Sequence, residues 1–224
     1  VREKRLDSSV FKIGLIGYTN AGKSTIMNAL TNKSQYEADE LFATLDATTK
    51  SVNLTGRFNV TLTDTVGFIQ DLPTELISSF KSTLEESKNV DLLVHVIDAS
   101  NPNHEEHEKT VLAIMKDLDM LDIPRLTLYN KADKAENFTP TLTPYVLISA
   151  KNENSRTVLQ NALLNKMREL FVPFRIKVSP SKAYKLHELE SLAIIDKREY
   201  LEESEMISGY IAEKNKWRLE EFYD

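Results

Sequence analysis

The chain has 224 residues, of which 41% are hydrophobic and 28% charged, a composition typical of a soluble globular protein with a sizeable core. It contains no cysteine, which excludes disulfides and thiolate metal sites and fits a reducing cytoplasm. The net charge of −6 argues against a basic surface that coats nucleic acid, although a local basic patch is compatible with it. No apolar run approaches the roughly 18 to 20 residues that a membrane span requires.

The first motif lies between a predicted strand at 11–16 and a predicted helix that ends near residue 31. It has the form G-x-x-x-x-G-K-[ST], whose backbone N–H groups wrap around a polyphosphate. We expect Lys23 to reach the β- and γ-phosphates and Ser24 to place its hydroxyl on Mg²⁺, while the helix dipole faces the anion. The predicted nucleotide-binding residues here are Gly17, Tyr18, Thr19, Asn20, Ala21, Gly22, Lys23, Ser24 and Thr25.

Asn20 allows two interpretations. Its side-chain oxygen can coordinate a monovalent cation such as K⁺ beside the phosphates, or the residue simply suits a turn with unusual backbone angles. We favour the turn, and a comparison of hydrolysis in potassium and sodium distinguishes the two.

Residues 32–50 lack sustained periodicity and are rich in Asp, Glu and Thr, and so long a loop within a domain is usually functional or mobile. In a GTPase this region supplies a hydroxyl to Mg²⁺. Three threonines qualify on chemistry alone, namely Thr44, Thr48 and Thr49, and their spacing does not choose among them. Two short strands are predicted next, at 51–54 and 59–63, with a turn between them.

The second of these strands runs into Asp64-Thr65-Val66-Gly67. Asp64 is expected to hold Mg²⁺ through water, and the N–H of Gly67 to donate to the γ-phosphate. Many small GTPases follow this glycine with a Gln that orients the attacking water, and here the residue is Phe68. We therefore expect slow intrinsic hydrolysis, on the order of 10⁻⁴ to 10⁻² s⁻¹, that depends on a partner or an ion. Phe68 equally fits an apolar plug in the switch region.

Helices and strands are predicted to alternate from residue 73 onward. The apolar patterns predict helices at 73–89, 103–118 and 159–170, and strands at 90–99, 125–129 and 145–148. This alternation predicts an α/β fold of the P-loop NTPase type, with a mostly parallel sheet and helices on both faces. His104 and His107 are spaced i, i+3 and lack a third metal ligand, so we interpret them as a solvated helix face.

Asn130-Lys131-Ala132-Asp133 follows a predicted strand and indicates guanine recognition. The Asp133 carboxylate can accept hydrogen bonds from guanine N1 and N2, for which adenine offers no matching donors. Lys131 can lay its stem over the base, and Asn130 can tie this loop to the phosphate loop. Ser149-Ala150-Lys151 completes the base site, with the N–H of Ala150 placed to donate to guanine O6. The predicted ligands are GTP and GDP.

The pattern changes after residue 171. We predict strands at 174–178, 194–201 and 206–219 and a helix at 182–192, which together make a small α+β domain. The predicted organisation is a linker at 1–10, a GTP-binding G domain at 11–171 and the small domain at 172–224. We expect the chain to be a monomer.

In the order and content of its motifs the sequence resembles the HflX family of ribosome-associated GTPases. The resemblance is carried by 17–25, by Phe42-Ala43-Thr44-Leu45-Asp46, by Asp64 through Ile69, by 80–86 and by Asp98-Ala99-Ser100. It implies that residues 42–46 join the nucleotide site and that Thr44 is the hydroxyl on Mg²⁺. Lys23, Thr44 and Gly67 would then catalyse hydrolysis by positioning and charge stabilisation, with no Gln at position 68. It also implies binding to the large ribosomal subunit and a cytoplasmic location.

Members of that family resemble one another in an N-terminal domain that precedes the G domain and is missing from this sequence. Its absence puts autonomous ribosome splitting by this chain in doubt. Two alternatives to a ribosome-linked GTPase stay open. One is a nucleotide-gated binding module whose hydrolysis is incidental, and the other is a GTPase that acts on a different RNA or in metabolism.

Overall fold

The computed structural model describes residues 8–18, 21–31, 48–64 and 87–223, so residues 73–86 of the predicted helix at 73–89 and residues 32–47 of the predicted loop at 32–50 lie outside the described residues. The strands are β1 Phe11–Ile16, β2 Thr48–Thr55, β3 Phe58–Asp64, β4 Leu92–Asp98, β5 Arg125–Asn130, β6 Tyr145–Leu147, β7 Val172–Val178, β8 Ala193–Leu201 and β9 Ser204–Ile211. The α-helices are α2 Lys23–Thr31, α4 His104–Asp117, α5 Ser155–Leu170 and α6 Leu186–Leu192. The 3₁₀ helices are η2 Ser87–Asn89, η3 Ala132–Lys134, η4 Pro180–Lys185 and η5 Glu213–Phe222.

The chain divides into two compact units. The larger unit comprises Lys12–Ser51 and Thr61–Gln160, and the smaller unit comprises Val1–Phe11, Val52–Val60 and Asn161–Asp224. The predicted boundaries at residues 10 and 171 stay predictions.

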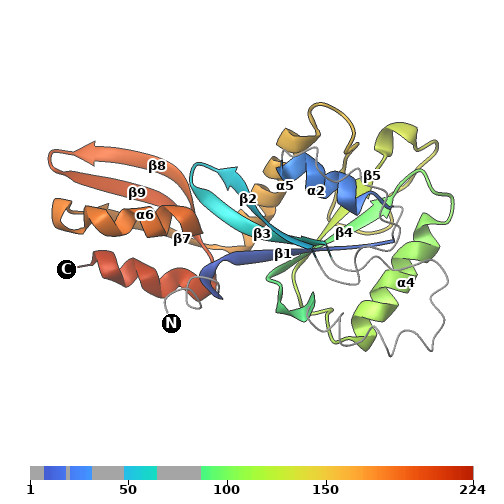
Figure 1. Ribbon diagram of the computed structural model, residues 1–224, viewed down its shortest axis with the longest axis horizontal. Coiled ribbons are helices and arrows are strands. Elements are labelled where there is room, and N and C mark those ends of the chain that lie inside the picture. Colours follow the sequence, from blue (N-terminus) through green and yellow to red (C-terminus); the bar gives the residue numbers. More distant parts are fainter. Residues whose placement is uncertain (1–7, 19–20, 32–47, 65–86, 224) are drawn as a thin grey trace. The chain divides into compact units, whose positions relative to one another are not determined.

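A six-stranded sheet with the order β2-β3-β1-β4-β5-β6 forms the framework of the fold. The pairs β1–β4, β4–β5 and β5–β6 are parallel. Figure 1 shows α2 and α4 on opposite faces of this sheet. The predicted α/β fold, with a mostly parallel sheet and helices on both faces, is therefore confirmed.

The α4 face of the sheet shows why the apolar runs fold as they do. Residues 92–97 of β4 are all buried, as expected for a central parallel strand covered on both faces. Leu93 packs with Val111 and Met115, which lie four residues apart on one side of α4. Each fully buried side chain of this kind contributes about 1.5 to 3 kcal/mol of transfer free energy.

The smaller unit contains an antiparallel sheet with the order β7-β9-β8, and α6 lies along it (Figure 1). In β7 the side chains of Phe174, Ile176 and Val178 are buried and those between them are exposed, which is the alternation of a strand with one face in a core. Leu189 of α6 and Ile207 of β9 belong to the same core. The predicted α+β composition of this part matches the structure.

The predicted strand at 206–219 is wrong in its second half. Strand β9 ends at Ile211, and Glu213–Phe222 form the 3₁₀ helix η5. The buried side chains of this segment are Asn215, Arg218, Leu219 and Phe222, and spacings of three and four residues are those of a helix rather than a strand. Asn215 also donates to the carbonyl oxygen of Ser9 at 2.7 Å, so η5 holds the beginning of the described chain.

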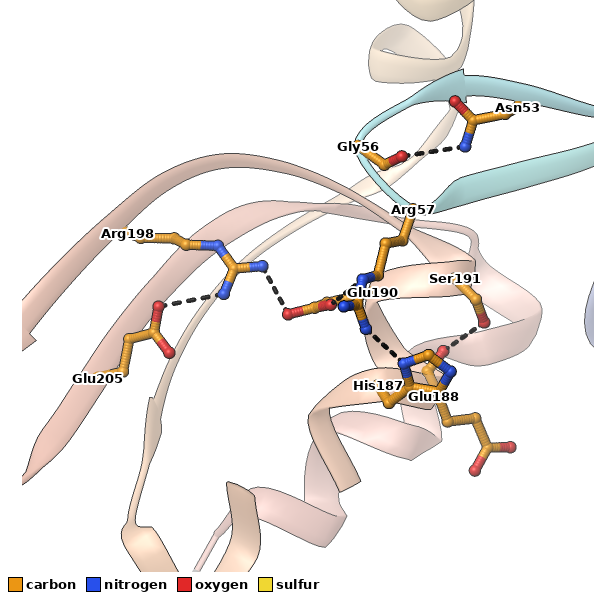
Figure 2. A network of polar contacts seen from close by, with 9 residues as sticks. All are labelled: Asn53, Gly56, Arg57, His187, Glu188, Glu190, Ser191, Arg198 and Glu205. Atoms are coloured by element: carbon orange, nitrogen blue, oxygen red, sulfur yellow. Dashed lines mark hydrogen bonds and ion pairs between the residues drawn. The ribbon is translucent and has the colours of Figure 1, made fainter. Parts of the chain in front are cut away.

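A polar network joins the turn between β2 and β3 to α6 within the smaller unit (Figure 2). Arg57 in this turn is hydrogen-bonded to His187 and lies 3.4 Å from Oε2 of Glu190. The other carboxylate oxygen of Glu190 accepts a hydrogen bond from Arg198 at 2.6 Å, and Arg198 also donates to Glu205 at 3.1 Å. Cationic and anionic side chains thus alternate along this network.

Candidate functional site

The phosphate loop joins β1 to α2, and its glycines stand where a side chain does not fit. A Cβ on Gly22 would lie 2.2 Å from Nδ2 of Asn130, and the φ of +99° at Gly22 is one that other residues rarely adopt. A Cβ on Gly17 would lie 2.3 Å from the carbonyl oxygen of Val96. The N–H of Ile26 donates to the carbonyl of Gly22 at 3.0 Å, so α2 begins directly behind the loop.

Lys23 and Asp64 form a buried pair whose charges are incompletely matched. Nζ of Lys23 lies 3.7 Å from Oδ1 of Asp64, which is beyond hydrogen-bond distance, and the two side chains are 5% and 24% exposed. Burial lowers the pKa of Lys23 against the opposing effect of the Asp64 charge. Burial likewise raises the pKa of Asp64, and Lys23 opposes that rise. Such a pair is poised to interact with a charged ligand.

The same region fits a magnesium ion in its donor chemistry. Among the described residues the buried Oδ1 of Asp64 has no hydrogen-bond partner, and the exposed Ser24 is the second residue of α2. Within the described ranges no cluster of three or more histidines and carboxylates is present. Mg²⁺ needs no such cluster, because it is usually held by one or two protein groups together with substrate phosphates and water. Ser24 and Asp64 therefore fit the ion.

Asn130 connects the two halves of the site. Its Nδ2 donates to the carbonyl of Ala21 in the phosphate loop at 3.0 Å, in agreement with the tie expected from the sequence. Its Oδ1 accepts from the N–H of Lys131 at 2.8 Å and from the N–H of Ala150 at 3.0 Å. The Ala150 N–H that was expected to face guanine O6 is therefore engaged with Asn130 in this structure.

The base loops meet in one pocket. Oδ1 of Asp133 accepts a hydrogen bond from Oγ of Ser149 at 2.7 Å, which brings the two predicted base motifs together. The pocket has a volume of about 140 Å³. It is lined by Gly22, Thr25, Asn130, Lys131, Asp133, Lys134, Ser149, Ala150 and Lys151. Phosphate-loop and base-loop residues thus share a single cavity.

Two contacts of the site were not expected from the sequence. Nζ of Lys131 donates to Oδ2 of Asp98 at 2.7 Å. The ring of Tyr18 in the phosphate loop stacks on His107 of α4 with a centroid separation of 4.0 Å. The interpretation of His104 and His107 as a solvated face is wrong, since both are half-buried and His104 is hydrogen-bonded to Glu108 at 3.1 Å.

Several predicted residues lie outside the described residues. They are Thr19, Asn20, Phe42, Ala43, Thr44, Leu45, Asp46, Thr65, Val66, Gly67 and Phe68. Of the three candidate threonines, Thr48 begins β2, and the hydroxyl of Thr49 is hydrogen-bonded to that of Thr63 at 2.9 Å. The role of Thr44 stays a prediction.

The fold is that of a P-loop nucleotide-binding domain, with a pocket beside its phosphate loop. Residues 12–131 match the model of a protein family described as 50S ribosome-binding GTPase. The chain belongs to this family, and its relatives place it among the HflX-type GTPases.

Two relatives illustrate this placement. The chain is 42% identical over 216 residues to the GTPase HflX of Alkalihalophilus pseudofirmus, a match that covers 95% of this chain and 51% of the relative. It is 45% identical over 170 residues to the GTPase HflX of Caldanaerobacter subterraneus subsp. tengcongensis, covering 76% of this chain and 39% of the relative. The chain thus spans about half the length of the relatives it matches, or less.

A solved structure extends the likeness to the fold. A crystal structure of a GTP-binding protein from Sulfolobus solfataricus in complex with GDP matches with a TM-score of 0.56 and 25% identity. The match covers 74% of this chain and 55% of that protein. None of the helices in the described part of the chain combines the length and apolar content of a membrane span.

Proposed function

We propose that this chain binds GTP and GDP and hydrolyses GTP to GDP and phosphate. The observation that supports this proposal is the shared pocket, in which Gly22 and Thr25 of the phosphate loop face Asp133 and Lys131 of the base loop. A nucleotide has the same two-ended chemistry, with a polyanion at one end and a base at the other. The carboxylate of Asp133 matches the N1 and N2 donors of guanine and leaves adenine without partners.

Different residues of the larger unit have different roles in the proposed hydrolysis. Lys23 and the loop N–H groups position the β- and γ-phosphates. Ser24 and Thr44, with Asp64 through water, would hold Mg²⁺, which would supply charge neutralisation at the phosphates. The N–H of Gly67 would contact the γ-phosphate. With Phe68 in place of Gln, no side chain there orients water, and turnover by the chain alone is slow.

The partner we propose is the large ribosomal subunit, because the family to which the chain belongs is described as ribosome-binding. The site of action is then the cytoplasm, which fits the absence of cysteine. K⁺ on Asn20 stays an alternative source of catalytic charge. The chain is proposed to act as a monomer.

The test is GTP turnover by this chain with and without purified large subunits, with Mg²⁺ present. We expect slow turnover alone and an increase of at least about 100-fold with the subunits, the scale of help that a partner supplies to a GTPase lacking full catalytic groups. Equal turnover in both conditions would favour a nucleotide-gated binding module instead. Stimulation by other RNA but not by large subunits would favour a GTPase with a different target.

A further inference from the structure

Asp98 lies next to the proposed base site but is not one of the residues that line its pocket. It is the last residue of β4, and its register partner across the sheet is Asn130, the last residue of β5. Parallel strands place their carboxyl ends at the same edge of a sheet. A carboxylate at the end of β4 therefore lies beside the loop that begins with Lys131.

The carboxylate of Asp98 is held in one orientation by two neighbours. Its Oδ1 accepts hydrogen bonds from the N–H of Ser100 at 3.0 Å and from the Oγ of Ser100 at 2.6 Å. Its Oδ2 accepts from Nζ of Lys131 at 2.7 Å. Burial alone raises the pKa of Asp98, but the hydrogen bonds from Lys131 and Ser100 outweigh it and lower that pKa, so the group is charged.

Lys131 is fixed at both ends by this arrangement. Its backbone is left-handed with φ of 59°, and its N–H donates to Oδ1 of Asn130 at 2.8 Å. Its ammonium donates to Asp98, and Lys131 is one of the residues that line the pocket. A free lysine side chain loses rotamer entropy when it is ordered, and here that ordering precedes ligand binding.

We propose that Asp98 is a positioning residue of the nucleotide site, which stretches the Lys131 stem along the wall of the pocket so that it is ready to lie against the face of a purine base. This inference rests on the proposed function, because it takes the pocket to be a guanine-nucleotide site. It assigns Asp98 to affinity and not to base choice, since a stem that covers the face of a ring does not read its edge. It also predicts that diphosphate and triphosphate nucleotides are affected equally.

The principal variant is Asp98→Asn, which keeps the size of the side chain and an oxygen that accepts from Ser100 but removes the charge. We expect its affinity for GDP and for GTP to fall about ten-fold, because Lys131 is no longer ordered in advance. The ratio of affinities for GDP and inosine diphosphate should stay unchanged, as should kcat at saturating GTP. Asp122→Asn is the matched control, because Asp122 is an exposed aspartate outside the pocket.

A double-mutant cycle distinguishes positioning from a merely structural role. In a Lys131→Met background, which keeps an apolar stem without the ammonium, Asp98→Asn should cause no further loss of affinity. A loss that persists in that background, or unchanged affinity of the single variant, would overturn the inference. If Asp98→Asn does not fold, Ser100→Ala is the second variant, with an expected loss of about three-fold that Lys131→Met again abolishes.

Failure of this inference is separable from failure of the proposed function. Asp133→Asn should shift binding from guanosine to xanthosine nucleotides, whatever Asp98 does. If Asp133→Asn retains its guanine preference, the assignment of the pocket is wrong. If it loses that preference while Asp98→Asn binds normally, only the role given to Asp98 is wrong.

Discussion

The two units each contain a cation beside a carboxylate, and they differ in how completely the charges are paired. In the smaller unit both oxygens of Glu190 face a guanidinium, from Arg198 at 2.6 Å and from Arg57 at 3.4 Å (Figure 2). The hydrogen bond that Arg198 donates to Glu190 raises the pKa of Arg198 above its usual value. In the larger unit Nζ of Lys23 lies 3.7 Å from Oδ1 of Asp64, and this buried oxygen has no hydrogen-bond partner in the part of the chain that the structure describes.

This difference indicates that the Glu190 cluster stabilises the fold, whereas the Lys23–Asp64 pair is suited to bind a ligand. A satisfied ion pair near the surface gains little from any further binding partner. A desolvated lysine and an unsatisfied carboxylate gain much from a phosphate and a metal ion, because both are charged groups that the protein alone leaves incompletely compensated. The proposed catalytic cluster is thus recognisable by the incomplete compensation of its charges.

Removing Lys23 should give the largest effect and tests the comparison directly. We expect Lys23→Ala to weaken binding of GTP on the order of 10³-fold, because charge-assisted hydrogen bonds to two phosphates are lost in a buried site, and to weaken binding of GDP less, because GDP lacks the γ-phosphate. The measurement is a titration with a fluorescent guanine nucleotide. Arg198→Ala removes a cation from the other cluster and should leave that affinity unchanged. Equal losses in both variants would contradict the distinction.

His95 is another buried polar group, and it does not line the pocket beside the phosphate loop. Its Nδ1 has no hydrogen-bond partner among the residues at 8–18, 21–31, 48–64 and 87–223, and burial, assisted by the charge of Arg125, lowers its pKa from 6.5 to about 3. In the unfolded chain His95 therefore takes up a proton at a higher pH than in the folded chain. The free energy of unfolding is therefore unaffected by His95 well above pH 6.5, and it decreases as the pH falls from there toward 3, because the unfolded chain takes up the proton first.

We expect His95 to reduce the free energy of unfolding by about 2 kcal/mol between pH 7 and pH 5. Urea denaturation at both pH values measures the change, and His95→Leu is the comparison because leucine does not titrate. The variant should show a smaller decrease over this interval than the natural sequence, by about that amount. Identical decreases in the two proteins would show that His95 is not held neutral by burial.

The sequence predicted the elements of the site whose chemistry is local. The phosphate loop, Asp133 and Ser149 are recognisable because each motif is contiguous and follows a strand, and parallel strands bring such loops to one edge. Their arrangement in space depends on the strand order, in which β4 lies between β1 and β5. The pairing of Asp98 with Lys131 depends on that order and on register, which a single sequence does not specify.

The C-terminal part was predicted less well for a different reason. The alternation of buried residues in β9 supports a strand up to Ile211, but the next buried positions include the polar Asn215 and Arg218. A hydrophobic pattern does not identify polar side chains that are buried because they have specific partners. Both side chains donate hydrogen bonds to Ser9, which lies more than 200 residues earlier. The position of η5 therefore depends on tertiary contacts that a local sequence pattern does not contain.

The smallest expected effect is that of Arg57, whose side chain is 60% exposed. Because Glu190 keeps its bond to Arg198, Arg57→Ala should lower the free energy of unfolding by only about 0.5 kcal/mol, and less at high salt. Arg198→Ala should cost more, since it removes a hydrogen-bond donor from both Glu190 and Glu205. Urea denaturation at low and high salt measures both. A larger loss from Arg57→Ala would mean that the hairpin turn, rather than α6 and β8, is what keeps the Glu190 cluster together.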